Sequence, residues 1–487
     1  MVLTNPVERV VRKRTRRDPK PRFKPDISGQ PDPIFGCPEA MVPAGHPARV
    51  VRDLVAQLDL SALEAQYSSL GCYGHHPRHK LAVWVYATQI GLHEATKVSR
   101  ACQTDLAFRL LSGGYSMSTA TLGRFPRENR EFFEQAVEQT VAMAQQRGLL
   151  DTSDLSVDSM RLRAHASPAA VRTVKRSTQR VKELAAVNVD ALDEDKRKRH
   201  EASLAKHQSA LQECKARGRT SIVATNESAA LMKFPNGASA PGHRITVTLA
   251  GMRQRLVVGV LVDAATTDHG KLGPALEKAR EVLKRAGVPD DVRLQVAADA
   301  GYTAIEDYAF AAEQRDWVDV LVPVADSDTA AGTRKGYFGR EHFKVVGERA
   351  TCPAEREMVG PYDDGDGRKK WMGAGCGDCA LKPRCTKGRR RALTLQPELE
   401  RVREQMRKRM QQPGARQRYN RRIATVEPVF ASLESVMGFR RASSRHARSV
   451  VAEVLLKILT HNLARLASAA RLFCVWCSFE TYSDQPS

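Results

Sequence analysis

Two aspartates stand where a carboxylate is costly unless it has a chemical role. Asp299 follows the apolar stretch 294–298 and precedes the turn segment AGY, and Asp158 lies within the alternating segment DLSVDSMRLRAHAS. A buried, unpaired carboxylate is unfavourable, so Asp299 is either a helix cap or part of a site. Carboxylates that converge repel one another, which makes structural sense mainly around a hard divalent cation such as Mg²⁺ or Mn²⁺.

A third candidate carboxylate lies far downstream in a segment of helical character. The segment RYNRRIATVEPVFASLESVMGFRR contains Glu427, which follows Tyr419, Arg421 and Arg422. Carboxylates this far apart in the sequence can converge only through the fold. Their spacing alone therefore does not establish a common site.

Four of the ten cysteines fall in one segment rich in Gly, Pro and Lys: Cys352, Cys376, Cys379 and Cys385. A CxxC pair with two further thiols fits a tetrahedral zinc site, which would organise a segment too small to bury a core. The alternative is a set of reduced structural cysteines. A second pair, Cys474 and Cys477, lies in an apolar run with no further pair nearby, which favours packing in the core.

The chain is strongly basic, with 77 Lys and Arg against 55 Asp and Glu and a net charge of +22. Such an excess favours a polyanionic partner, because Lys and Arg neutralise phosphates and release counterions. A basic surface that only promotes solubility is the alternative. The sequence lacks an apolar run of membrane-helix length, the apolar core of a signal peptide and a Walker-type phosphate loop. We therefore expect a cytoplasmic protein with no membrane partner and no implied use of ATP.

Changes in pattern along the chain indicate its domains. Residues 1–45 are basic and rich in proline, and we expect a disordered arm. Residues 46–150 have apolar positions at helical spacing, and we expect a helical DNA-binding domain. Within it, GGYSMSTATLGRFPREN predicts a short capped helix that carries Arg124. That helix is compatible with a helix-turn-helix reader or with an ordinary turn in a helical bundle.

From residue 151 onward the pattern changes to strands, and helices then alternate with them. HRITVTLAG and QRLVVGVLVDAATTD predict an antiparallel pair, and VRLQVAAD and WVDVLVPVA predict later strands. This order predicts an α/β fold, an RNase H-like mixed sheet flanked by helices, over residues 151–325 and 396–475. The charged segment 173–217 predicts an inserted helical hairpin, and residues 340–392 form a cysteine-rich insertion.

These segments together resemble the bacterial insertion-sequence transposases of the DDE superfamily. HHPRHKLAVWVYA, ACQTDLAFRLLSGG and TATLGRF resemble the helical N-terminal domain of that family. VDSMRLRAHAS, TNESAALMK, ADAGY and RRIATVEPVFASLE resemble its catalytic core. The resemblance covers roughly residues 45 to 470 and implies an RNase H-like catalytic domain with a cysteine-bearing insertion before its last acidic helix.

Carried over by position, the resemblance assigns Asp158, Asp299 and Glu427 as the catalytic carboxylates. They would bind Mg²⁺ or Mn²⁺, with two ions expected, and the metal would neutralise Asp299. Asp263 and Asp268, near the end of the preceding predicted hairpin, are the fallback candidates for a carboxylate in this site.

The resemblance also implies side chains that contact DNA, most of them basic. The candidates are Arg124, Tyr419, Arg421, Arg422, Arg440 and Arg441. Relatives often carry a Lys or Arg after the glutamate, whereas the seventh residue after Glu427 here is Glu434. Arg440 and Arg441 are the nearest basic substitutes. Ser118 stands where relatives commonly carry an acid.

The function implied is a DNA transposase that cuts and joins strands in a metal-dependent reaction. Its partners would be the terminal inverted repeats and target DNA, on which a homo-oligomer would assemble. Two alternatives stay open. One is a nuclease or domesticated derivative that cuts DNA without joining it, and the other is a DNA-binding protein without enzymatic activity.

Overall fold

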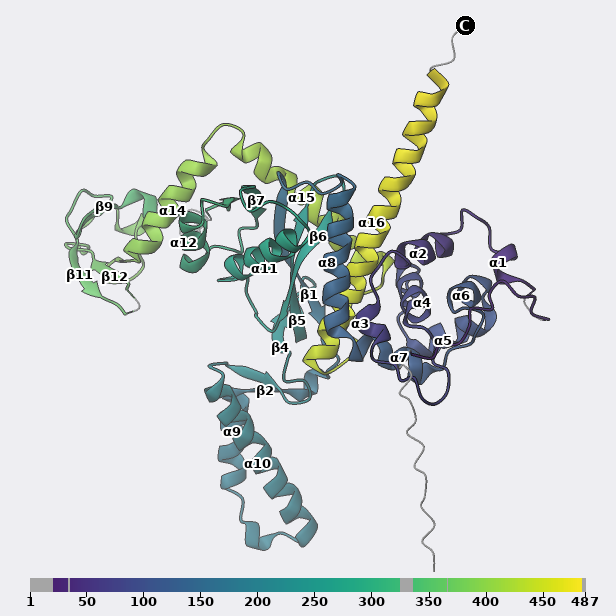
Figure 1. The fold of residues 1–487 in the computed structure, drawn as a ribbon. Coiled ribbons are helices and arrows are strands. Elements are labelled where there is room, and N and C mark those ends of the chain that lie inside the picture. Colours follow the sequence, from purple (N-terminus) through teal and green to yellow (C-terminus); the bar gives the residue numbers. More distant parts are fainter. Residues whose placement is uncertain (1–20, 34–35, 325–335, 366, 484–487) are drawn as a thin grey trace, which may run out of the picture. The chain divides into compact units, whose positions relative to one another are not determined.

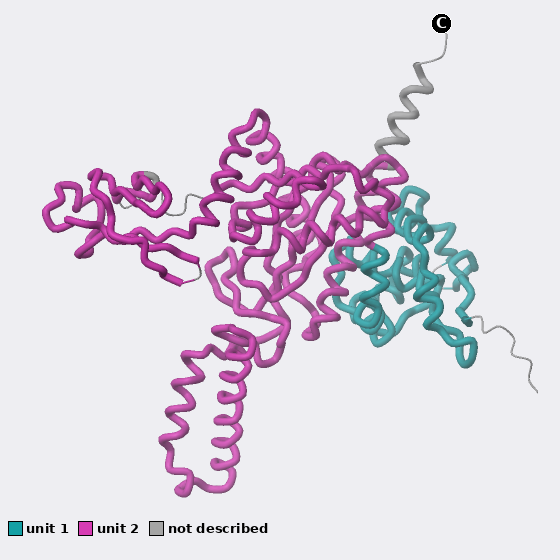
Figure 2. Tube along the Cα trace, turned by 60° about the vertical axis from the view of Figure 1, so that its left-hand side comes forward, with its two compact units in different colours: residues 1–136 teal, residues 137–487 magenta. Residues whose placement is uncertain are grey.

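The computed structural model of the protein describes residues 21–33, 36–324, 336–365 and 367–483. The chain divides into two compact units, Met1–Ala136 and Val137–Ser487 (Figure 2). The division falls inside helix α8, Arg130–Gln146. Residues 1–20, the most basic part of the predicted disordered arm, lie outside the described residues, as do the side chains of Cys474 and Cys477.

The first unit is helical in the part of the chain that the structure describes. Its helices are α1 (Pro38–Met41), α2 (Pro47–Val55), α3 (Ser61–Glu64), α4 (Pro77–Gln89), α5 (Ala95–Thr104), α6 (Leu106–Leu111) and α7 (Thr119–Glu128), followed by the first part of α8. Both α2 and α4 begin with a His-Pro pair. His46 and His76 accept hydrogen bonds from Ala48 N and Arg78 N, and the following prolines occupy a position that needs no N–H donor.

The described part of the predicted arm packs onto these helices. The ring of Phe23 lies edge-on to Tyr67 with 5.1 Å between centroids, and the amide of Ile27 donates to the carbonyl of Gly113 at 3.1 Å. The next residue, Gly114, has a positive φ of 85°, and a Cβ there would lie 2.6 Å from Cγ1 of Ile27. The glycine pair seen in the sequence therefore lets residues 21–33 lie against the helical unit.

The second unit is built on a six-stranded mixed sheet (Figure 1). Its strands are β1 (Leu155–Arg163), β4 (Ala230–Lys233), β5 (Ser239–Ala250), β6 (Leu256–Asp263), β7 (Leu294–Ala298) and β8 (Val318–Leu321). Strand β5 pairs antiparallel with β1, β4 and β6, whereas β7 pairs parallel with β1 and β8. The predicted α/β class is confirmed, and the predicted antiparallel pair is β5 with β6.

Helices cover one face of this sheet, where the first residues of β1 present apolar side chains. Leu155 and Val157 pack into a core with α11 (Leu272–Arg285), α12 (Ile305–Glu313) and α14 (Pro397–Met410). Side chains alternate between the two faces of a strand, so Asp158 faces away from that core. Helix α15 (Ala415–Ala431) packs against β1 and β7.

The long helix α16 (Ala447–Ser483) is fixed to the start of β6 by buried polar groups. Asn462 accepts a hydrogen bond from the amide of Val257 at 2.9 Å and donates to its carbonyl at 3.0 Å. The adjacent His461 lies with its Nε2 2.9 Å from the carbonyl oxygen of Arg255. These contacts satisfy strand groups that would otherwise be buried without partners.

We expect His461 to make the second unit less stable in acid. Burial lowers the pKa of His461 from 6.5 to about 4. A lowered pKa contributes stability that is present above pH 6.5 and lost as the pH falls toward 4, amounting to about 3 kcal/mol at 1.36 kcal/mol per unit. Urea unfolding followed at several pH values should show that His461→Gln flattens this dependence. His165→Gln, at an exposed histidine of the same unit, is the control, and equal pH profiles for both variants would contradict the assignment.

Two insertions interrupt the second unit. The first is a helical hairpin, α9 (Val174–Ala185) and α10 (Glu194–Ala216), with the short strands β2 (Val171–Thr173) and β3 (Ser221–Val223) paired at its base. The second contains the strands β9 (Lys344–Val346), β10 (Arg349–Thr351), β11 (Val359–Asp363), β12 (Lys369–Met372) and β13 (Ala392–Leu395). Within the described residues, no helix combines the length and apolar character needed to cross a membrane.

Candidate active site

The parallel pairing of β1 with β7 brings two of the predicted carboxylates together. The last paired residues are Val157 and Ala298, so the next residues along the two strands are Asp158 and Asp299. Adjacent parallel strands lie about 4.8 Å apart. The two aspartates therefore occupy neighbouring positions where the pairing of β1 with β7 ends, although 140 residues separate them in the sequence.

A buried arginine bridges the two aspartates. Arg422 of α15 donates from Nη1 to Oδ2 of Asp158 at 2.5 Å and from Nη2 to Oδ1 of Asp299 at 3.1 Å. The planar guanidinium suits this role, because its two amino groups point in the same direction toward separate acceptors. Arg422 also lies over the ring of Tyr419, with Cζ 5.8 Å from the centroid. The helix thus supplies a cation at the point where the two strands present negative charge.

The negative charge of Asp158 is not fully compensated by this ion pair. The pKa of Asp158 is raised to about 6, mainly by burial and also by the neighbouring Asp299 and Asp268, against the opposing effects of Arg422 and the Ser159 amide. A carboxylate with a raised pKa is one whose negative charge is incompletely compensated. Additional positive charge at this edge of the sheet would therefore be favourable.

Asp268 lies close to this pair and is held by partners of its own. It accepts hydrogen bonds from Ser159 Oγ and from Arg244 Nη1, and Arg244 also donates to the carbonyls of residues 265 and 266. Gly301 packs against the same carboxylate, since a Cβ on Gly301 would lie 2.8 Å from Oδ2 of Asp268. The glycine of the ADAGY segment is thus required by the carboxylate beside it.

The pairing of Arg244 with Asp268 was not expected from the sequence. Arg244 is only 1% exposed although it lies within the apolar strand β5. A charged residue inside a buried strand needs a partner, and this signal could have directed attention to Asp268. Asp263, the other fallback candidate, forms an ion pair with Lys271 at 2.7 Å.

Glu427 lies on α15, but the structure does not pair it with the two aspartates. It is exposed, and five residues separate it from Arg422, which places it about 140° around the helix from that side chain. The buried positions near it are Thr425, Val426 and Val429.

The remaining predicted DNA contacts near the sheet lie on two elements. Arg421 is exposed on α15, beside the buried Arg422. Arg440 and Arg441 follow the π-helical turn Ser432–Val436 and run beside the end of β1, where the amide of Arg163 donates to the carbonyl of Arg440 at 3.3 Å. The side chain of Arg440 donates to the backbone carbonyl of Glu434 at 3.3 Å.

In the helical unit, Arg124 is exposed on α7. That helix begins at Ser118, whose hydroxyl accepts a hydrogen bond from the amide of Thr121 at 3.1 Å. Ser118 is therefore an N-cap, a role for which serine is well suited. Trp84 of α4 donates to the carbonyl of Leu122 at 3.0 Å and fixes α7 within the unit.

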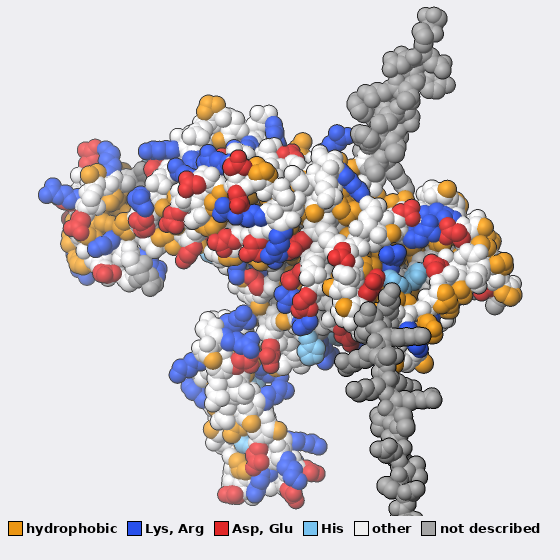
Figure 3. Space-filling model, viewed as in Figure 1, with side chains coloured by type: hydrophobic (Ala, Val, Ile, Leu, Met, Phe, Trp, Pro, Cys, Tyr) orange, Lys and Arg blue, Asp and Glu red, His pale blue; other side chains and the backbone are white. Residues whose placement is uncertain are grey.

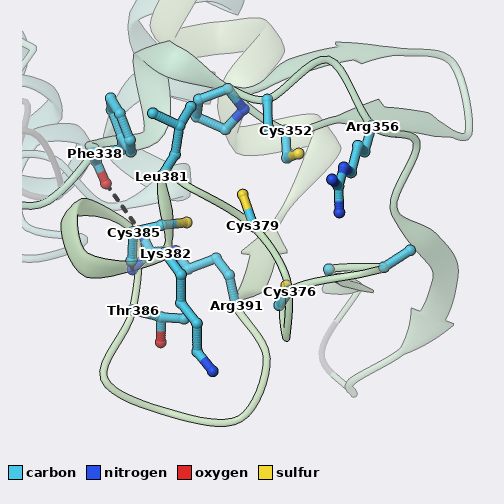
Figure 4. A pocket seen from close by; sticks show the side chains of 14 residues that line it. Phe338, Cys352, Arg356, Cys376, Cys379, Leu381, Lys382, Cys385, Thr386 and Arg391 are labelled. Atoms are coloured by element: carbon cyan, nitrogen blue, oxygen red, sulfur yellow. Dashed lines mark hydrogen bonds between the residues drawn. The ribbon is translucent and has the colours of Figure 1, made fainter.

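The four cysteines of the second insertion surround one small cavity (Figure 4): Cys352, Cys376, Cys379 and Cys385. The cavity has a volume of about 20 Å³, roughly that of one water-sized sphere. Burial raises the pKa of the Cys385 thiol, Arg391 opposes this, and the other three cysteines raise it further. A Cβ on Gly373 would lie 2.6 Å from the sulfur of Cys376, so a glycine is needed there.

This insertion also buries a small apolar core. Its members are Phe343, Ala350, Met358, Trp371, Leu393 and Leu395, with Cys352 and Cys385 packed against them. The expectation that the segment could bury no core is therefore wrong in part. Phe343, Leu393 and Leu395 lie outside the stretch from Cys352 to Cys385, and the strands bring them to it.

Among the described residues, no group of three or more His, Cys, Asp or Glu side chains is arranged to hold a metal ion. The donor chemistry nevertheless fits two metals. Mg²⁺ in phosphate chemistry is held by one or two carboxylates together with phosphate oxygens, and Asp158 and Asp299 already share a cation, the guanidinium of Arg422. Four thiols around one cavity are a donor set suited to Zn²⁺.

Two family models match parts of this chain. A family model described as a transposase DDE domain matches residues 351–467, and one described as a transposase domain matches residues 37–128. The first range contains Arg422 and Glu427 and lies beyond Asp158 and Asp299, and the second contains Arg124. A search of curated proteins finds no match.

Proposed function

Because this chain is an insertion-sequence transposase of the DDE type, we propose that it cuts DNA at the ends of its element and joins the released 3′-hydroxyl to target DNA. The observation that carries the proposal is the pair Asp158 and Asp299, which lie side by side where the pairing of β1 with β7 ends and share the guanidinium of Arg422. Two adjacent carboxylates could hold a divalent ion for metal-dependent phosphoryl transfer.

Asp158 and Asp299 would hold Mg²⁺ or Mn²⁺, one or two ions, with phosphate oxygens of the DNA completing the ligands. When bound, such ions activate the attacking oxygen and stabilise the leaving oxygen of an in-line displacement. The raised pKa of Asp158 favours this role, because a buried carboxylate with incomplete compensation gains from a second positive charge. DDE transposases generally use divalent metals.

Arg422 would have a second role once a metal ion, instead of its guanidinium, neutralises the two carboxylates. Its guanidinium is then free for a bidentate contact with a phosphate of the DNA strand, and Tyr419 beneath it limits the directions in which it can turn. Arg421, Arg440 and Arg441 would add contacts to the neighbouring phosphates. Exposed arginines suit this positioning role, which carries no sequence information.

The third carboxylate of the site has two candidates. Glu427 is favoured by its place on the helix that carries Arg422, within the matched DDE domain. Asp268 is favoured by its proximity, since its charge raises the pKa of Asp158. We propose Glu427 as the third carboxylate, and Asp268 as a neighbour that holds Ser159 and Arg244 in place.

The first unit would recognise the terminal repeats, with the basic segment 1–20 as an added source of phosphate contacts. We expect Arg124→Ala to weaken binding to an element-end duplex about tenfold, because a bidentate arginine contact contributes about 1–3 kcal/mol. Fluorescence anisotropy at several salt concentrations measures this. Arg100→Ala, at an exposed arginine on α5, is the matched control, and equal losses in the two variants would remove Arg124 from the interface.

One assay separates transposition from its alternatives. The purified chain is mixed with labelled element-end DNA, a target plasmid and Mg²⁺ or Mn²⁺, and products are resolved for strand cleavage and strand joining. Joined products support a transposase. Cleavage without joining indicates a nuclease, and binding alone indicates a protein without enzymatic activity.

A further inference from the structure

The helical hairpin of α9 and α10 has no part in the site described above, yet it carries a groove of unusual composition. The groove lies along α9 at the base of the hairpin and is lined by Val171, Arg172, Lys175, Arg176, Gln179, Arg180, Glu183 and His207. Lys and Arg side chains project from this hairpin in Figure 3. Four of the eight lining residues are Lys or Arg, and one is acidic.

The positive charge of the groove is not neutralised within the hairpin. Glu183 pairs with Arg180 at 3.0 Å, which leaves Lys175 and Arg176 without an acidic partner among the described residues. Arg172 is held over backbone carbonyls, donating to that of Ala169 at 2.6 Å. The groove therefore keeps an excess of about three positive charges over its single acid.

These charges also stand at the wrong end of the helix for stability. Lys175 and Arg176 lie in the first turn of α9, which contains no acidic residue. The N-terminus of a helix carries a partial positive charge, so cations there are unfavourable by a few tenths of a kcal/mol each. A cost of this kind is expected where a surface binds an anion, which reverses its sign.

A histidine on the opposite helix, His207, is influenced by the same positive charges. His207 of α10 faces α9, with Nδ1 3.2 Å from Ser177 Oγ. Burial lowers the pKa of His207, and Arg172, Arg180, Lys206 and Arg176 lower it further. Cations from both helices therefore act on one space.

We propose that this groove binds the phosphate backbone of duplex DNA, as a contact additional to the helical unit. The proposal rests on the proposed function, which supplies the DNA. Arg176 and Arg180 are one turn apart, a rise of about 6 Å, so the two side chains can contact separate phosphates of one strand. No Phe, Tyr or Trp lines the groove, so it offers no stacking platform for the bases of a single strand.

The test compares two triple variants of the full-length chain that remove the same charge from the same hairpin. The groove variant combines Lys175→Gln, Arg176→Gln and Arg180→Gln, which removes three positive charges from the groove. Lys196→Gln, Lys198→Gln and Arg199→Gln alter the start of α10, where Lys196 and Lys198 are paired with Asp193 and Glu194. Glutamine has a helix propensity close to those of Lys and Arg, so both variants should fold.

Binding to a labelled duplex is measured by anisotropy without divalent metal over a range of salt concentrations. The groove variant should bind about 10 to 100 times more weakly at low salt, with a slope of log K against log salt reduced by about 2 to 3. The control should change affinity less than about threefold. Equal losses in the two variants, or a larger loss for single-stranded than for duplex DNA, would overturn the proposal.

The outcome is independent of catalysis. Because no metal is present, a chain that never cleaves DNA still reports whether the groove binds it. Conversely, a groove variant that cuts normally at saturating DNA while binding weakly would support the groove and leave the assignment of the carboxylates untouched.

Discussion

Replacing Asp158 or Asp299 by asparagine is expected to lower the rate of DNA cleavage at least about a thousandfold while leaving DNA binding nearly intact. Each change removes one negative charge from the pair that would hold the metal. Metal ions stabilise developing charge by several kcal/mol, and 4 kcal/mol corresponds to roughly a thousandfold in rate. Single-turnover cleavage of an element-end duplex measures the loss, with anisotropy for binding.

The matched control for this experiment is Asp263→Asn. Asp263 lies at the end of strand β6 of the same sheet and pairs with Lys271 instead of Arg422. It should cut DNA at a rate within a few-fold of the unaltered chain. If Asp158→Asn or Asp299→Asn also kept that rate, the assignment of the altered residue would be wrong.

The same assay decides between the two candidates for the third carboxylate. Glu427→Gln should abolish cleavage without loss of stability, because Glu427 is exposed. Asp268→Asn should instead lower the unfolding midpoint, since it leaves the buried Arg244 without its partner, at a cost of about 3–5 kcal/mol. A stable, inactive Asp268→Asn variant together with an active Glu427→Gln variant would assign Asp268 as the third ligand.

The second large effect is expected at the cysteine cluster. Cys376→Ser combined with Cys379→Ser should remove about one zinc ion per chain and unfold the insertion, since structural zinc contributes about 10–16 kcal/mol in zinc-finger peptides. The six-residue apolar core is too small to hold the fold alone. Elemental analysis measures the zinc, and limited proteolysis should show new cleavage between residues 336 and 395.

The control for the cluster removes two cysteines from the other unit. Cys37→Ser with Cys72→Ser alters thiols that are partly or fully exposed and lie outside the cavity. Zinc content and proteolysis should not change. A fully folded, active chain purified without zinc would leave the four thiols as ordinary reduced cysteines.

Much of the sheet could be predicted because its strands are apolar in a regular pattern. The first four residues of β1 alternate apolar and polar side chains, and that alternation places Asp158 on the face opposite Leu155 and Val157. The predicted pair of β5 and β6 has the long apolar runs of a buried hairpin. An aspartate directly after such a run is visible without any structure, as with Asp299.

The contacts around the aspartates could not be predicted because they depend on how distant elements face one another. The sequence shows Arg421, Arg422 and Glu427 on one helix, but not which of them points toward the sheet. The packing of Thr425, Val426 and Val429 fixes that rotation and directs Arg422 to the aspartates. The ion pair of Arg244 with Asp268 likewise depends on a loop whose path no local pattern determines.

The boundary between the two units also could not be predicted from the periodicity of apolar residues. Helix α8 has one continuous helical pattern, yet the division falls at Ala136 and Val137 within it. Val141 belongs to the core beneath the sheet. A helix that serves two units has apolar residues for both, and its period alone does not reveal the change.

The bridge from Arg422 to Asp158 has a consequence for the chain during its synthesis. The two residues are 264 positions apart, and a ribosome adding about 5–20 residues per second needs roughly 13 to 53 s to cover that distance. Asp158 and Asp299 are both synthesised before Arg422, so each is without its arginine partner for part of this time. Nascent or truncated chains that end between Asp299 and α15 therefore carry two carboxylates without Arg422, and only a chain that includes α15 can assemble the site.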